Sequence, residues 1–104
     1  MTRIGGQIMS IEEIIHEKSG EIRRIAAKHG AFNVRIFGSV ARGEAGAESD
    51  VDLLVDVGSA TSSWFPAGLI LDLESLLGCK VDVVTERALN PDLRDYVLHE
   101  AVPL

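Results

Sequence analysis

The chain has 104 residues, 46% of them hydrophobic and 25% charged, which is typical of one small soluble globular domain. The formal net charge of −6, with no basic stripe, argues against duplex DNA or RNA as a substrate. The sequence has no apolar run long enough to span a membrane, no signal-peptide core, and a single cysteine, Cys79, so we expect a cytoplasmic protein without internal disulfides.

Hydrophobic periodicity and turn residues predict one α/β domain over residues 10–104, preceded by a flexible tail over residues 1–9 that contains Gly5-Gly6. The elements predicted in chain order are a helix at 10–29, a strand at 31–37, a helical turn at 40–44 ended by Gly46, a strand at 50–57, a helix at 64–77, a strand at 80–85 and a helix at 91–101. The histidines of the first helix, His16 and His29, are predicted to be solvated. The order of elements indicates a small mixed sheet with helices packed mainly on one face.

Capping residues mark where the predicted helices begin. Ser10, followed three residues later by a glutamate, is a capping-box pattern, and Asn90 is an N-cap residue with Pro91 at the first helical position. The start of the middle helix allows two interpretations for Trp64 and Phe65. They are either core residues or side chains that stack on a base or contact a partner protein.

The most distinctive pattern lies in the first half of the chain. An apolar strand ends abruptly at Gly38-Ser39, and ten residues later a second apolar strand begins with Asp50-Val51-Asp52. Asp50 and Asp52 share one face of that strand, and two carboxylates on one face repel each other unless a proton or a divalent cation lies between them. Glycine at a strand end lets an anionic ligand approach the backbone closely, and the serine hydroxyl and the amides that follow can donate hydrogen bonds to phosphate oxygens. The combination is typical of phosphoryl or nucleotidyl transfer.

Two longer segments extend this pattern. They are Gly38-Ser39-Val40-Ala41-Arg42-Gly43-Glu44 and Ser49-Asp50-Val51-Asp52-Leu53-Leu54-Val55. Together they resemble the signature of the DNA polymerase beta-like nucleotidyltransferase superfamily, in its minimal nucleotidyltransferase branch. The resemblance covers nearly the whole chain and implies a polymerase beta-like nucleotidyltransferase core.

The resemblance also implies a third carboxylate on a neighbouring strand, where Asp82 lies in a short β-branched run. Asp50, Asp52 and Asp82 would then be the catalytic carboxylates and the ligands of two Mg²⁺ ions, with Mn²⁺ as an alternative because both metals suit hard oxygen ligands. Asp82 is also the candidate acceptor for the proton of the attacking hydroxyl. Asp56 shares the face of Asp52, but we expect it too far along the strand to share a metal with it.

The nucleotide is expected to be ATP, with its terminal phosphates held by Gly38 and Ser39. Arg42 has two interpretations: it contacts the triphosphate, which we favour because arginine matches phosphate geometry, or it forms a structural pair with Glu44 or another carboxylate. All three residues are therefore candidate nucleotide-binding residues.

Minimal nucleotidyltransferases of this kind act as antitoxins that are paired with HEPN-domain ribonuclease toxins. The resemblance therefore implies transfer of AMP from ATP to a tyrosine hydroxyl of such a toxin, in a hetero-oligomer with it. Two alternatives stay open: a non-catalytic antitoxin that neutralises its partner by binding alone, and a small-molecule nucleotidyltransferase of the aminoglycoside-modifying type.

Overall fold

The computed structural model describes residues 2–4, 7–44, 50–58 and 65–104, with the side chains described from Ser10 onward. Its elements are β1 (Thr2–Ile4), β2 (Gln7–Met9), α1 (Ile11–Glu17), α2 (Ser19–Lys28), β3 (Ala31–Phe37), α3 (Gly38–Ala41), β4 (Val51–Val57), α4 (Ala67–Leu77), β5 (Val81–Thr85), the 3₁₀ turn η1 (Glu86–Ala88), α5 (Pro91–Glu100) and β6 (Val102–Pro103). None of the helices in these ranges is both long and apolar enough to cross a membrane.

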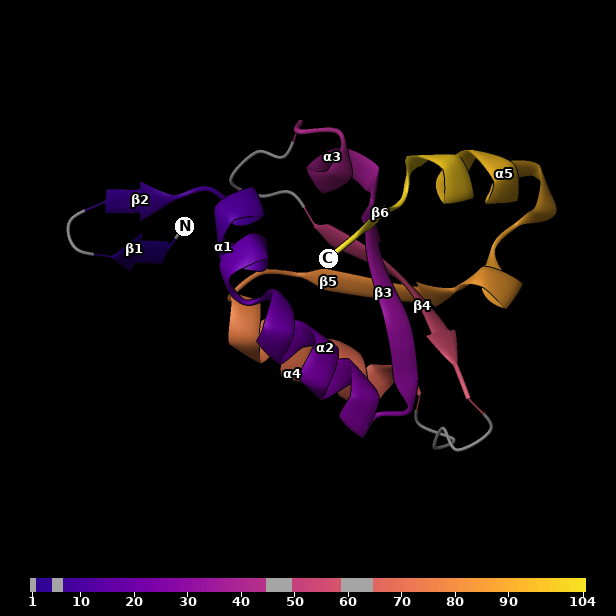
Figure 1. Ribbon diagram of the computed structural model, residues 1–104, viewed down its shortest axis with the longest axis horizontal. Helices are drawn as coiled ribbons and strands as arrows, with labels where there is room; N and C mark the ends of the chain where they lie inside the picture. The colour runs from indigo at the N-terminus through magenta and orange to yellow at the C-terminus, as the bar shows by residue number, and fades with distance from the viewer. Residues whose placement is uncertain (1, 5–6, 45–49, 59–64) are drawn as a thin grey trace.

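A four-stranded mixed sheet organises the fold, with the strand order β5-β4-β3-β6. β4 and β5 are parallel, and α4 connects them, as a crossover between parallel strands requires. β3 runs antiparallel to both β4 and β6. Figure 1 shows α2 and α4 side by side at the lower left of the sheet, with α1 leading into α2 from above, whereas α5 lies apart from them at the upper right. The fold is therefore the mixed α/β arrangement that the sequence predicts.

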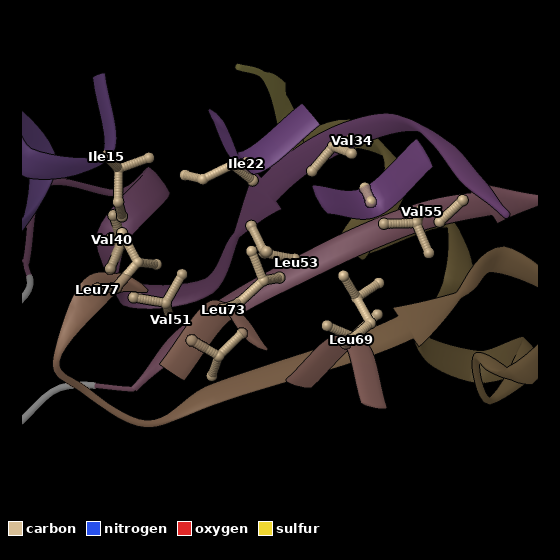
Figure 2. Close-up of a cluster of buried hydrophobic side chains, with 14 of the residues drawn as sticks. Ile15, Ile22, Val34, Val40, Val51, Leu53, Val55, Leu69, Leu73 and Leu77 are labelled. Atoms are coloured by element: carbon tan, nitrogen blue, oxygen red, sulfur yellow. The ribbon is translucent and has the colours of Figure 1, made fainter. Parts of the chain in front are cut away.

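One face of the sheet meets the helices in a continuous apolar core (Figure 2). Val51, Leu53 and Val55 alternate along β4 and are almost completely buried there. They pack with buried residues of α2 and α4, among them Ile22 and Leu69. Because the strand alternates, Asp52 between these residues must point to the opposite face, which is where the sequence places the carboxylates.

The capping prediction for the first helix is confirmed, but the helix is not continuous. The hydroxyl of Ser10 accepts a hydrogen bond from the Glu13 N–H at 3.2 Å, as an N-cap residue does. α1 then ends at Glu17 and α2 begins at Ser19, with Lys18 between them at φ −96° and ψ 11°. The buried residues Ile15 and Ile22 are seven residues apart, so the apolar stripe keeps its helical spacing across the interruption at Lys18.

The ends of the chain differ from the sequence prediction. Thr2–Ile4 and Gln7–Met9 pair as antiparallel strands, where no secondary structure was predicted. Gly-Gly between two short runs is a hairpin signal, but strands of three residues are too short to show alternation. Val102–Pro103 forms the edge strand β6, which was missed because it has two residues and contains a proline.

Several smaller expectations are tested as well. His29 is not simply solvated, because its Nε2 lies 2.7 Å from Asp72 Oδ2. The middle helix begins at Ala67 rather than at position 64, and Phe65 packs against the core, as the core interpretation required. The last helix begins at Pro91 as predicted, and its Leu93 is 55% exposed. Trp64 and Gly46 lie outside the described residues.

Candidate active site

The sheet register brings the predicted carboxylates to one end of β4 and β5. Asp52 and Asp82 are direct neighbours in the parallel pairing of these strands, and Asp50 comes immediately before the first residue of β4. On the other side, Asp52 lies opposite Phe37, the last residue of β3. Asp50 and Asp82 are exposed, whereas Asp52 is half-buried. The three carboxylates therefore lie at one edge of the sheet, on the face that points away from α2 and α4.

The charge on Asp52 is electrostatically unfavourable in this position. Burial and then the negative charges of Asp82 and Asp50 raise the pKa of the Asp52 carboxyl above its ordinary value. The charge of Arg42 acts in the opposite direction on the same pKa. The three acids are therefore close enough to repel one another, and a bound cation would relieve this repulsion.

The donor set suits a hard divalent cation, although it is not a closed cage. Over residues 2–4, 7–44, 50–58 and 65–104, no three or more histidine, cysteine, aspartate or glutamate side chains are grouped as metal ligands. Mg²⁺ is usually held by one or two carboxylates together with water and substrate phosphates, so a closed protein cage is not required. Asp50, Asp52 and Asp82 could thus hold a metal jointly with a nucleotide.

Gly38 lies directly against Asp52. Its backbone adopts a φ of +78°, which favours glycine, and a β-carbon at this position would overlap the Asp52 Oδ2 atom. Ser39 follows it in α3, which starts at Gly38 and so begins two residues before the predicted helical turn. The sequence predicts Gly38 as a phosphate contact, and the structure shows in addition that its lack of a side chain makes room for Asp52.

Arg42 forms the structural pairs that were the second of its two interpretations. Its Nε donates to Glu44 Oε2 at 3.2 Å, and its Nη1 donates to Glu100 Oε2 at 3.0 Å and to Glu100 Oε1 at 3.2 Å. These hydrogen bonds, first with Glu100 and then with Glu44, raise the pKa of the guanidinium above its ordinary value. A contact between Arg42 and the triphosphate remains a prediction.

Glu100 was missed by the sequence analysis. Its Oε1 accepts a hydrogen bond from the Gly38 N–H at 2.6 Å, and its side chain is only 13% exposed. Burial alone would raise the pKa of Glu100, but hydrogen bonds from the Gly38 N–H and from Arg42 lower it overall. A glutamate at the end of a helix has no local signal for such a role, because its partner Gly38 is 62 residues away.

Asp56 has a separate structural role at the other end of β4. Its Oδ1 accepts from Arg35 Nη2 at 2.8 Å, and its Oδ2 accepts from Asn33 Nδ2 at 2.9 Å. Its distance along the strand predicts that it cannot share a metal with Asp52, and in the structure it instead pairs with Arg35 and Asn33. Residues 45–49, between the Arg42 turn and Asp50, lie outside the described residues.

Comparison with known proteins decides the family. A sequence model described as "Nucleotidyltransferase domain" matches residues 10–104. The chain belongs to the nucleotidyltransferase domain family. This confirms the resemblance that was based on the Gly38-Ser39 and Asp50-x-Asp52 motifs.

Relatives of this nucleotidyltransferase match it over most of their length. A "putative protein adenylyltransferase" of Methanocaldococcus jannaschii is 42% identical over 88 residues, covering 85% of this chain and 95% of the relative. The protein adenylyltransferase MntA of Thermococcus cleftensis is 35% identical over 95 residues, covering 91% of this chain and 96% of the relative.

Solved structures of similar fold agree with this assignment. One described as a "putative minimal nucleotidyltransferase" superposes with a TM-score of 0.81 at 47% identity, covering 95% of this nucleotidyltransferase and 100% of that chain. A chain in a toxin–antitoxin crystal structure with AMP-PNP superposes with a TM-score of 0.69 at 22% identity, covering 81% of this chain and 69% of that chain. At that identity the second likeness concerns the fold alone.

Proposed function

We propose that this nucleotidyltransferase transfers AMP from ATP to a tyrosine hydroxyl of a partner protein, a HEPN-domain toxin, and so acts as its antitoxin in a hetero-oligomeric, cytoplasmic complex. Two relatives that match over nearly their whole length are named protein adenylyltransferases. Chains of similar fold occur in toxin–antitoxin crystal structures, one of them with AMP-PNP. The HEPN partner and the tyrosine acceptor are inferred from the resemblance to minimal nucleotidyltransferases.

The observation that best supports catalysis is the position of Asp52. This carboxylate lies beside Asp82 in the sheet register and against Gly38, and its pKa is raised by burial and by the neighbouring acids. A protein that neutralised its partner by contact alone would gain nothing from this arrangement, because an unrelieved acid cluster costs stability. A carboxyl whose pKa is raised by burial and by neighbouring acids is typical of a catalytic site.

Asp50, Asp52 and Asp82 are the residues that would hold Mg²⁺, in two sites, or Mn²⁺. When bound, such ions supply neutralisation of the triphosphate charge and a lower pKa of the attacking hydroxyl. Asp52 is half-buried and neighbours Asp82 in the sheet register, with Asp50 two residues before it in the chain, so all three could contribute oxygen ligands.

The side chains around the carboxylates position the substrates. Gly38 lets the terminal phosphates approach the backbone and Ser39 donates to them, with Arg42 beside them at the end of the same turn. Asp82 is exposed, so an acceptor hydroxyl from another protein can reach it and give up its proton there. The acceptor oxygen bonds to the α-phosphorus, the bond from that phosphorus to the pyrophosphate oxygen breaks, and pyrophosphate leaves.

The test is to purify the chain together with the product of the neighbouring gene, add ATP and Mg²⁺, and record the intact masses of both proteins. We expect the partner to gain mass in whole AMP units and a peptide map to locate the acceptor on a tyrosine. Asp52→Asn should abolish the gain while leaving the fold intact, because it removes one charge from the metal-binding set. Near-full transfer by Asp52→Asn would contradict the assignment.

The two alternatives give different results in the same experiment. A complex that forms and inhibits the partner without any mass increase would mean that binding alone neutralises the toxin. Turnover of ATP with an aminoglycoside and no partner protein would instead indicate a small-molecule nucleotidyltransferase.

A further inference from the structure

The carboxylate of Glu100 bridges two parts of the turn that follows β3. Oε1 accepts from the Gly38 N–H at 2.6 Å, while both oxygens accept from Arg42 Nη1, at 3.2 and 3.0 Å. We call these contacts the Glu100 bridge. The carboxylate is charged, is 13% exposed and has charge-assisted hydrogen bonds on both oxygens, which makes it a strong attachment point for the turn.

The position of Glu100 is itself fixed by the sheet. Glu100 is the last residue of α5, and β6 begins two residues later. Val102 of β6 pairs with Ile36 of β3, two residues before Gly38. The bridge therefore closes a small ring in which both ends are attached to the same strand, so the backbone of Glu100 is held close to the Gly38–Arg42 turn.

The other side of Gly38 faces the proposed catalytic acid, since a β-carbon on Gly38 would overlap Asp52 Oδ2. We infer that Glu100 is a positioning residue of the transfer reaction: through the Glu100 bridge it holds the Gly38–Arg42 turn against Asp52 and stays in place when nucleotide binds. This inference rests on the proposed function, and it gives the end of α5 a direct influence on the active site.

The bridge also controls where a positive charge lies. The Arg42 guanidinium is held by Glu100 through Nη1 and by Glu44 through Nε. Without Glu100, it would keep only the hydrogen bond to Glu44, and its Nη1 could turn toward the carboxylates of the site and compete there with a cation. Glu100 thus keeps Arg42 away from the three carboxylates, which stay available for a metal, and it holds the turn in its observed conformation.

Two variants of Glu100 separate these effects. Glu100→Ala removes the bridge, and we expect kcat/KM for ATP to fall at least about tenfold, since small misplacements of substrate-binding groups have effects of this order or larger. Glu100→Gln keeps an oxygen that can accept from the Gly38 N–H, so it should lose less activity than Glu100→Ala. Asp95→Asn, an exposed acid of the same helix, is the control and should stay within about twofold of the unsubstituted chain.

The Gly38 amide proton gives a readout of the bridge that does not depend on turnover. A short hydrogen bond to a carboxylate moves an amide proton downfield in the NMR spectrum. The Gly38 resonance should be downfield in the unsubstituted chain, shift upfield in Glu100→Ala and move least in Glu100→Gln. It should stay downfield when the unsubstituted chain is saturated with Mg²⁺ and a non-hydrolysable ATP analogue.

Two results would overturn the inference. One is any folded Glu100 variant that has lost the downfield Gly38 resonance and still has kcat/KM within about twofold of the unsubstituted chain. The other is an upfield shift of Gly38 on nucleotide binding, which would mean that the Glu100 carboxylate no longer accepts from this amide. Failure of the proposed function would look different, because the unsubstituted chain itself would then transfer no AMP, while the Gly38 resonance would still report whether Glu100 holds the turn.

Discussion

Gly38 satisfies two independent demands, one on the backbone and one on space. Its φ of +78° disfavours residues with a β-carbon, and the carboxylate of Asp52 occupies the volume that a β-carbon would need. Gly43, five residues later, has a similar φ of +72°, but among the described residues, its chain neighbours aside, no atom lies within 4 Å of where its β-carbon would be. Comparing substitutions at the two glycines therefore separates the cost of the strained backbone from the cost of crowding Asp52.

We expect Gly43→Ala to lower the free energy of unfolding by about 1 kcal/mol, because it introduces left-handed strain alone. Gly38→Ala should cost about 1–3 kcal/mol more, because the added methyl group overlaps Asp52 and forces the turn or the carboxylate to move. Urea unfolding of the two variants measures the difference. Equal losses in the two proteins would show that the contact with Asp52 has no energetic consequence.

At this same scale, the sequence predicts the site only where the signal is local. Asp50 and Asp52 could be placed on one face because strand alternation is a short-range rule, and their partner Asp82 followed from the family resemblance. Glu100 could not be found, since its contact with Gly38 depends on how α5 and β6 return to β3. Its role is a consequence of tertiary structure and has no signature in the neighbouring residues.

At the scale of elements, a polar contact joins α2 and α4, two of the helices that cover the sheet. His29, at the C-terminal end of α2, lies with Nε2 2.7 Å from Oδ2 of Asp72 in α4. The hydrogen bond from His29 is the main reason that the pKa of Asp72 is lowered. The His29 ring also lies beside Gly68, where a β-carbon would come within 3.1 Å of it, so the helices approach closely at this point.

The lowered pKa of Asp72 defines the pH range in which this contact stabilises the fold. A carboxyl with a lower pKa in the folded state contributes stability above its unfolded pKa and loses it as the pH falls through the folded value. We expect Asp72→Asn to have a lower Tm than the unsubstituted chain at neutral pH, with a difference that shrinks in acid. Thermal unfolding as a function of pH checks this, with Asp95→Asn as the exposed control. A Tm difference that is independent of pH would contradict the assignment to the Asp72 carboxylate.

Element positions were predictable where a periodic segment was long and its ends were capped. β3 matches its predicted bounds, and α5 begins at Pro91 after the Asn90 cap, as predicted. The interruption at Lys18 was not predicted, because the spacing of apolar residues along the sequence is the same in a bent helix and in a continuous one. β6 has too few residues for any periodic signal and is defined only by its pairing with β3.

At the scale of the whole molecule, the two faces of β4 carry different side chains: one face is apolar, and the other has two acids on either side of the buried Leu54. One face of β4 is buried in the core through Val51, Leu53 and Val55, and the opposite face presents Asp52 near the beginning of the strand and Asp56 near its end. These two acids share a strand and a face, but they have opposite surroundings. Asp56 is paired with Arg35, whose side chain is 13% exposed, whereas Asp52 is surrounded by other acids.

The fold should therefore be more stable without the charge of Asp52. Its pKa is raised in the folded state, so its contribution to stability is fully present below its unfolded pKa and is lost as the pH rises through the folded value. At neutral pH, with divalent cations removed by a chelator, we expect Asp52→Asn to have a higher Tm than the unsubstituted chain. This gain should shrink as the pH is lowered through the raised pKa of Asp52, where the unsubstituted carboxyl becomes protonated.

Asp56→Asn is the matched control and should have a lower Tm at neutral pH, because it leaves the nearly buried guanidinium of Arg35 without its closest carboxylate. Mg²⁺ added with nucleotide should raise the Tm of the unsubstituted chain more than that of Asp52→Asn, since a ligand stabilises the folded state that binds it. A lower Tm for Asp52→Asn in chelator would show that the charged carboxylate stabilises the cation-free fold through a structural partner, which would contradict the prediction.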